Sequence, residues 1–231
     1  MAARVDALTG TGPVLLLSYD GASGSGHSDE PSEQTVAYTY DNALATIALL
    51  ACGSDRQAQR IGAALRLAAL GGARLRNAYR AGAVAEAPLA NGWWDNQGKH
   101  WAEDPQQQGT ATGNVAWVAL ALLDLHAAGG QAQWVGPARR LGAWIVEETA
   151  DRRGAGGFDG GIEGDDAHAR KVAWKSTEHN IDAAALFDRL AGVDKSGDWT
   201  RHADAARNFV QSEWDAASGH FFVGTLPDGV T

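Results

Sequence analysis

Two acidic residues, Asp41 and Glu178, stand just before an asparagine at the start of a long apolar stretch. Apolar residues follow Asn42 and Asn180 on nearly every helical face, which predicts buried helices with both acids in a first turn. Two carboxyl groups across a bond can hydrolyse a glycoside, one as proton donor and the other as base or nucleophile. The helix dipole favours the charged form of a first-turn acid, which suits a base. The alternative is that both acids only complement the charge of their helix ends.

Asp182 lies one helical turn after Glu178 and on the same face. On an apolar helix its carboxyl group would be buried, and burial raises the pKa as a proton donor requires. Asp182 is therefore the reserve acid. Its alternative role is a polar anchor in the core, bonded to His179 or to a loop.

Aromatic and polar residues are mixed in the segment 91–101, which contains Trp93, Trp94 and Trp101. Sugar rings stack on aromatic rings and bond to polar groups at their rim, so this mixture is typical of a sugar subsite. The alternative is a loop that packs on itself and plugs the ring end. The other residues expected to bind substrate are Tyr38, Tyr40, His179, Asp159 and Glu163, the last two in a glycine-rich loop whose glycines also suit tight turns.

A repeated pair of helices is expected to position these candidate site residues. Three similar segments align on Asn42, Asn114 and Asn180, and each apolar helix is followed by a one-sided helix with charges between its apolar residues. We predict helical hairpins at about 33–72, 112–151 and 176–218, with the second helix of the middle pair starting near Val135 because Pro137 is tolerated only in a first turn. Short strand-like pieces fall in the loops between hairpins, at 74–79, 157–162 and 220–223.

The openings of the three apolar helices carry a resemblance. Tyr38-Thr-Tyr-Asp-Asn-Ala-Leu-Ala, Thr112-Gly-Asn-Val-Ala-Trp and Lys175-Ser-Thr-Glu-His-Asn-Ile-Asp resemble bacterial proteins of the six-hairpin glycosidase-like superfamily. The resemblance implies an all-α fold, an (α/α) toroid whose inner helices form a ring, with the site at one end. Six hairpins close such a ring and this chain supplies three, so we expect a single, partial toroid domain over residues 1–231.

Composition limits the partners. The formal charge of −9 argues against nucleic-acid binding, and no stretch is long enough to span a membrane. The single cysteine, the scattered histidines and the absence of a phosphate-binding loop predict neither a metal site nor a cofactor. We expect a soluble protein, cytoplasmic as written and extracytoplasmic if a signal peptide has been removed.

The sequence therefore predicts a glycoside hydrolase acting on a polysaccharide or oligosaccharide. Three alternatives stay open: a polysaccharide lyase with Tyr40 or His179 as base, a non-catalytic carbohydrate-binding module, and a helical-repeat scaffold that binds protein. An open half-ring exposes apolar helix sides, so we also expect association through the 33–52 or 176–218 edges, or a longer native gene.

Overall fold

The computed structural model describes residues 1–19 and 30–229. Eight helices lie in these ranges: α1 (Ala2–Ala7), α2 (Thr39–Ala51), α3 (Asp55–Leu70), α4 (Pro105–Gln108), α5 (Thr112–Gly129), α6 (Val135–Thr149), α7 (Thr177–Val193) and α8 (Trp199–Ser212). Two short 3₁₀ helices, η1 (Pro31–Glu33) and η2 (Ala132–Trp134), accompany them. The strands are β1 (Val14–Leu15), β2 (Val36–Tyr38), β3 (Ala78–Arg80), β4 (Gly82–Ala83), β5 (Trp93–Asp95), β6 (His100–Ala102), β7 (Thr110–Ala111), β8 (Gly161–Glu163), β9 (Arg170–Val172), β10 (Lys175–Ser176), β11 (Trp214–Asp215), β12 (His220–Phe221) and β13 (Gly224–Thr225).

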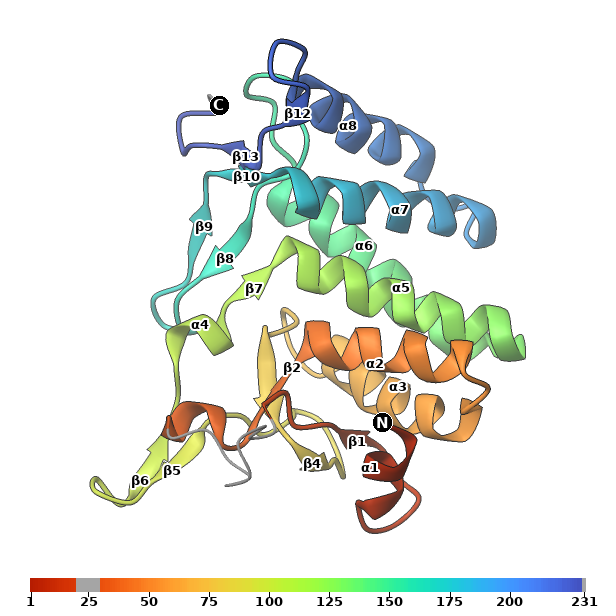
Figure 1. The fold of residues 1–231 in the computed structure, drawn as a ribbon, viewed down its shortest axis with the longest axis vertical. Helices are drawn as coiled ribbons and strands as arrows, with labels where there is room; N and C mark the ends of the chain where they lie inside the picture. The colour runs from red at the N-terminus through yellow and green to blue at the C-terminus, as the bar shows by residue number, and fades with distance from the viewer. Residues whose placement is uncertain (20–29, 230–231) are drawn as a thin grey trace.

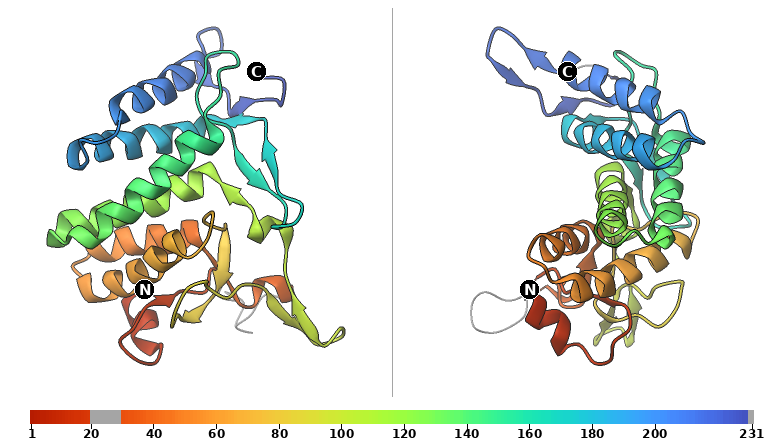
Figure 2. Two further views of the ribbon diagram at one scale, coloured as in Figure 1. Left: turned by 180° about the vertical axis from the view of Figure 1, so that it is seen from behind. Right: turned by 90° about the vertical axis from the view of Figure 1, so that its right-hand side faces the viewer.

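Six of the helices form three pairs, α2 with α3, α5 with α6 and α7 with α8 (Figure 1). The inner helices α2, α5 and α7 pack side by side in that order, and the outer helices cover them from behind (Figure 2). One cluster of buried apolar residues runs through all three pairs. The hairpins thus lie where the sequence repeat predicts them, with slightly narrower bounds.

The middle pair shows how the sequence sets these elements. Helix α5 is buried on almost all sides, as its nearly continuous run of apolar residues requires. It ends at Gly129 and is followed by Gly130, whose φ of 67° suits a residue without a side chain. Helix α6 begins at Val135, which leaves Pro137 in the first turn as predicted. None of the described helices is both long and apolar enough to cross a membrane.

A threonine starts each inner helix and fixes its N-terminal end. The backbone N–H of Thr39, Thr112 and Thr177 donates to a loop carbonyl at 2.9, 3.0 and 2.9 Å, and each hydroxyl group donates to the same segment. The acceptors are Asn77 for Thr39, Asp159 and Gly160 for Thr112, and Phe222 and Val223 for Thr177. In all three cases the segment is the one that follows the outer helix of the same pair.

These threonines correct the predicted repeat. Asn42 and Asn180 both stand three residues after their threonine, but Asn114 stands only two after Thr112. Asn180 bonds to the backbone N–H and carbonyl of Phe158 at 2.9 and 3.0 Å, and Asn42 bonds to Leu16 in the same way at 2.8 and 3.0 Å. Asn114 instead donates to the side chain of Asn77. It lies at the predicted helix end, but it is not the equivalent of the other two asparagines.

The contrast between these asparagines predicts unequal effects on stability. Asn180 is fully buried and its replacement by leucine leaves two backbone groups of Phe158 unpaired, which should lower the free energy of unfolding by about 3 kcal/mol. Asn114→Leu removes one partly exposed hydrogen bond and should cost about 1 kcal/mol or less. Urea unfolding measures both, and equal losses would contradict the register set by the threonines.

Candidate active site

The N-terminal turns of the inner helices meet at the end of the molecule where most strands gather (Figure 1). Alignment on the three threonines shows which side chains occupy matching positions. One residue later these are Tyr40, Gly113 and Glu178; two later, Asp41, Asn114 and His179; five later, Leu44, Trp117 and Asp182. The three predicted carboxylates therefore come from two different inner helices with α5 between them.

Asp182 is buried in this region, with 7% of its surface exposed. Burial raises the pKa of its carboxyl group to about 7, and the negative charge of Glu178 adds to the rise. The indole N–H of Trp117 opposes the rise, although among the described residues neither this group nor Asp182 Oδ2 has a hydrogen bond of normal geometry. The site thus holds a buried carboxyl group whose Oδ2 atom has no hydrogen-bond partner among the described residues.

His179 lies beside Asp182 across the backbone of Gly113. A Cβ atom at Gly113 would come within 2.6 Å of His179 Cδ2 and 3.4 Å of Asp182 Oδ2. Burial lowers the pKa of His179, and the charge of Glu178 opposes this only in part, so the imidazole is neutral at pH 7. Its Nδ1 atom has no hydrogen-bond partner among the described residues, and its ring packs against Trp174 at 5.8 Å between centroids.

Tyr40 completes the cluster from the side of α2. Its ring meets Trp117 edge to face, with centroids 5.8 Å apart. Burial raises the pKa of its phenol, and the negative charges of Glu178, Asp182 and Asp41 raise it further. The charges of Glu178, Asp182 and Asp41 thus all reach the Tyr40 phenol, and the role of these three acids in one site stays a prediction.

The predicted aromatic subsite is a separate feature. Strands β5 and β6 form a hairpin in which Trp94 and Trp101 pair edge to face at 5.7 Å and stay about half exposed. The guanidinium of Arg80 stacks on Trp101 at 3.6 Å, and Trp93 lies half-buried beside them. The hairpin packs on η1 and projects from the strand-bearing end (Figure 1). The ring of Tyr38 packs edge to face against Tyr19, with centroids 6.1 Å apart.

Asp159 and Glu163 are both held by arginines. Arg153 donates to Asp159 at 2.9 Å, and Arg170 donates to Glu163 at 2.6 Å. Burial and the negative charge of Asp151 raise the pKa of Asp159 to about 6, while Arg153 and Lys175 oppose the rise. Their geometry favours the alternative use of this loop, in turns that are packed and ion-paired over the ring end.

Sequence reasoning missed Trp117 and Gly113. The apolar periodicity of α5 indicates a packing role for Trp117, which does pack against the core, and its ring also meets that of Tyr40 edge to face. The register of the threonines is the signal that could have found it, since Trp117 and Asp182 occupy the same position on adjacent helices. Among the described residues, no group of three or more His, Cys, Asp or Glu side chains is arranged to hold a metal ion.

Comparison with known proteins identifies the fold. No model of a known protein family matches the sequence, and no curated protein matches it. The structure superposes on D-mannose isomerase with a TM-score of 0.66 and 14% identity, over 88% of this chain and 51% of that one. An alpha-amylase from Clostridium perfringens gives a TM-score of 0.65 and 10% identity, over 98% and 57% of the two chains. The chain has the fold of about half of an α/α toroid, the architecture of six-hairpin glycosidase-fold enzymes.

A cellobiose 2-epimerase from Spirochaeta thermophila also matches, with a TM-score of 0.58 and 14% identity over 99% of this chain and 54% of that one. The chain thus spans about half the length of the solved toroids it matches, which is consistent with the predicted partial toroid. An isomerase, an epimerase and an amylase share this fold, so the fold leaves the reaction open and the site residues must decide it.

Gly113 offers a direct test of the crowding at the site. Glycine to alanine at the second position of a helix normally raises stability by up to about 1 kcal/mol. Gly136 has the same position in α6 and nothing within 4 Å of its missing Cβ, so Gly136→Ala should show that gain. Gly113→Ala should instead lower the free energy of unfolding by about 1 to 3 kcal/mol because the His179 ring must move. Equal shifts in urea unfolding for the two variants would contradict the close packing of His179 on Gly113.

Proposed function

We propose that the N-terminal ends of α2, α5 and α7 contribute half of a carbohydrate-active site that hydrolyses glycosides. The observation that carries the proposal is the buried carboxyl group of Asp182, whose Oδ2 atom has no hydrogen-bond partner among the described residues and whose pKa is raised by burial and by the charge of Glu178. A pair of carboxyl groups with unequal proton affinity is what acid–base cleavage of a glycosidic bond requires. Asp182, the reserve acid of the sequence analysis, is therefore the principal proton donor in this proposal, and Asp41 or Glu178 is its partner.

In this proposal each carboxyl group has one role in the cleavage of the glycosidic bond. Asp182 gives its proton to the glycosidic oxygen as the bond to the anomeric carbon breaks. Glu178 or Asp41, both exposed, either activates the attacking water or attacks the anomeric carbon directly. The aromatic faces of Tyr40, Trp117 and Trp174 border the same cluster and suit the apolar faces of sugar rings.

A second reaction on the same class of substrate is favoured by His179. Burial lowers the pKa of its imidazole, the ring edge formed by Cδ2 and Nε2 faces Gly113 beside Asp182, and Nδ1 has no hydrogen-bond partner among the described residues. A neutral base beside a protonated acid can remove a proton from the carbon next to a sugar carbonyl and return one, which isomerises or epimerises the sugar. This candidate forms no glycosyl intermediate and releases no reducing ends.

One screen separates these functions. The chain is incubated in D₂O with a panel of oligosaccharides and reducing sugars, and its products are analysed by chromatography and mass spectrometry. Release of new reducing ends supports hydrolysis, and deuterium in a rearranged sugar supports isomerisation or epimerisation. An unsaturated product indicates a lyase. Sugar binding without any turnover indicates a silent binding module and contradicts the proposal, as does the absence of both binding and turnover.

A further inference from the structure

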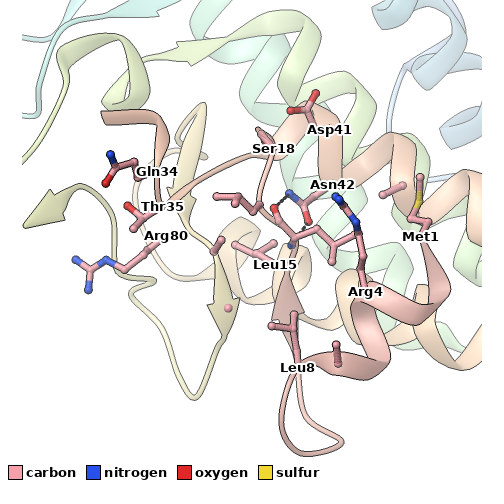
Figure 3. Close-up of a pocket in the computed structure, with 16 residues that line it drawn as sticks. Met1, Arg4, Leu8, Leu15, Ser18, Gln34, Thr35, Asp41, Asn42 and Arg80 are labelled. Atoms are coloured by element: carbon pink, nitrogen blue, oxygen red, sulfur yellow. Dashed lines mark hydrogen bonds between the residues drawn. The ribbon is translucent and has the colours of Figure 1, made fainter. Parts of the chain in front are cut away.

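A groove runs along the edge of α2 that faces away from α5. It measures about 790 Å³ and lies between α1, the segment 14–18 and α2 (Figure 3). Its walls are mainly apolar, from Ala7, Leu8, Leu15, Leu16, Leu17 and Ala45. A cylinder of this volume and about 10 Å across is about 10 Å long, which is nearly two turns of an α-helix with its side chains.

The segment 14–18 repeats a contact seen elsewhere in the fold. Leu16 pairs with Asn42 as Phe158 pairs with Asn180, so Leu17 matches Asp159 and Ser18 matches Gly160. The carbonyls of Asp159 and Gly160 accept hydrogen bonds from Thr112, the first residue of the inner helix that precedes α7. By this register, the carbonyls of Leu17 and Ser18 occupy the positions that accept hydrogen bonds from the first residue of a neighbouring inner helix, and both residues line the groove.

Helix α1 occupies the outer position beside the groove. It packs on α3, as α6 does, and the buried Arg60 holds it by donating to the carbonyls of Val5 at 2.7 Å and Gly12 at 2.9 Å. An incoming pair of helices would therefore clash with α1, whereas a single inner helix would not. The chain covers only 51%, 54% and 57% of three solved toroids, so those chains are long enough to hold further helices of the ring.

We propose that this groove binds one inner α-helix of the polypeptide that completes the ring, with the N-terminal turn of that helix at Leu17 and Ser18. The incoming helix places its first-turn residues beside Asp41, which lines the same groove. A second copy of this chain fits less well, because each of its inner helices already carries an outer helix. The proposal does not depend on the reaction, and its test needs no enzymatic activity.

Disulfide trapping tests both binding and polarity. The probe is a peptide of residues 175–195, an inner helix of this chain with a threonine in its first turn, carrying an added cysteine at either its N- or its C-terminus. The protein carries Cys52→Ala and Leu17→Cys. We expect the N-terminal cysteine to react at least tenfold faster, since about 25 Å of helix separates the two ends. Equal rates, or a faster C-terminal cysteine, would overturn the proposal.

Two matched charge variants test whether the disulfide trapping takes place in the groove. Ala7→Glu places a charge in the groove and should reduce trapping to the rate of a scrambled peptide, whereas Ala3→Glu, exposed on the same helix but outside the groove, should not. If the peptide does not bind in trans, it is fused ahead of Met1 through a flexible linker. Lack of hydrogen-exchange protection at residues 15–17 in the fused protein would then overturn the proposal. A dimer that Ala7→Glu abolishes and Ala3→Glu preserves would assign the groove to a second copy instead.

Discussion

Replacement of Asp182 by asparagine is expected to stabilise the protein at pH 8 and to abolish its acid–base chemistry. The pKa of this carboxyl group rises from 3.8 to about 7 on folding, so its contribution favours the folded state fully below pH 3.8 and is lost as the pH rises through 7. At pH 8 the wild-type protein holds a buried charge at a cost of about 4 kcal/mol, from 1.36 kcal/mol for each pH unit of the shift. Asparagine carries no charge and avoids this cost, so the gain should vanish near pH 4.

Activity should change in the opposite direction. Loss of a general acid lowers turnover about a hundredfold or more, measured on the substrate found in the screen. Asp188→Asn is the matched control on the same helix, since Asp188 is exposed and paired with Arg207, and surface pairs contribute about 0 to 1 kcal/mol. A variant at Asp182 that gains stability without losing turnover would show that Asp182 is a strained core residue and not the acid.

The sequence predicted the positions of the helices better than it predicted which side chains contact one another between helices. Apolar residues on all faces mark α5 as an inner helix, and Pro137 marks the start of α6, because both signals act within one element. The placement of Asn114 failed because a short motif can slide by one residue, and only the hydrogen bonds of Thr112 fix its register. A one-residue error on a helix turns a side chain by about 100°.

The site shows the same limit. Burial of Asp182 follows from its position on an apolar helix, and the structure confirms that burial. Contacts across helices do not follow from spacing, so the approach of Gly113 to His179 and of Trp117 to Tyr40 could not be predicted. The tryptophans of β5 and β6 were recognised by composition, yet their hairpin packs on η1 and stacks on Arg80. Their role as a sugar subsite stays a prediction.

Glu178→Gln is expected to change both turnover and the titration of its neighbour. Glu178 is exposed in the first turn of α7, where an amide replaces the carboxylate at a cost of about 1 kcal/mol or less, so the fold should survive. If this carboxylate is the base or nucleophile, turnover falls at least about a hundredfold. Removal of its negative charge also lowers the pKa of Asp182 below 7, because that charge is one cause of the rise.

Asp41→Asn separates a loss of turnover from a change in the pKa of Asp182. The charge of Asp41 raises the pKa of Tyr40 but is not among the causes of the shift at Asp182. Carbon NMR of the Asp182 carboxyl group should therefore show a lower pKa in Glu178→Gln and an unchanged one in Asp41→Asn. An acid that must be protonated to act then loses activity at a lower pH, so the basic limb of the pH profile moves down only in Glu178→Gln. If both variants keep the wild-type titration and near-wild-type turnover, Glu178 and Asp182 do not form the acid–base pair, and His179 becomes the residue to replace next.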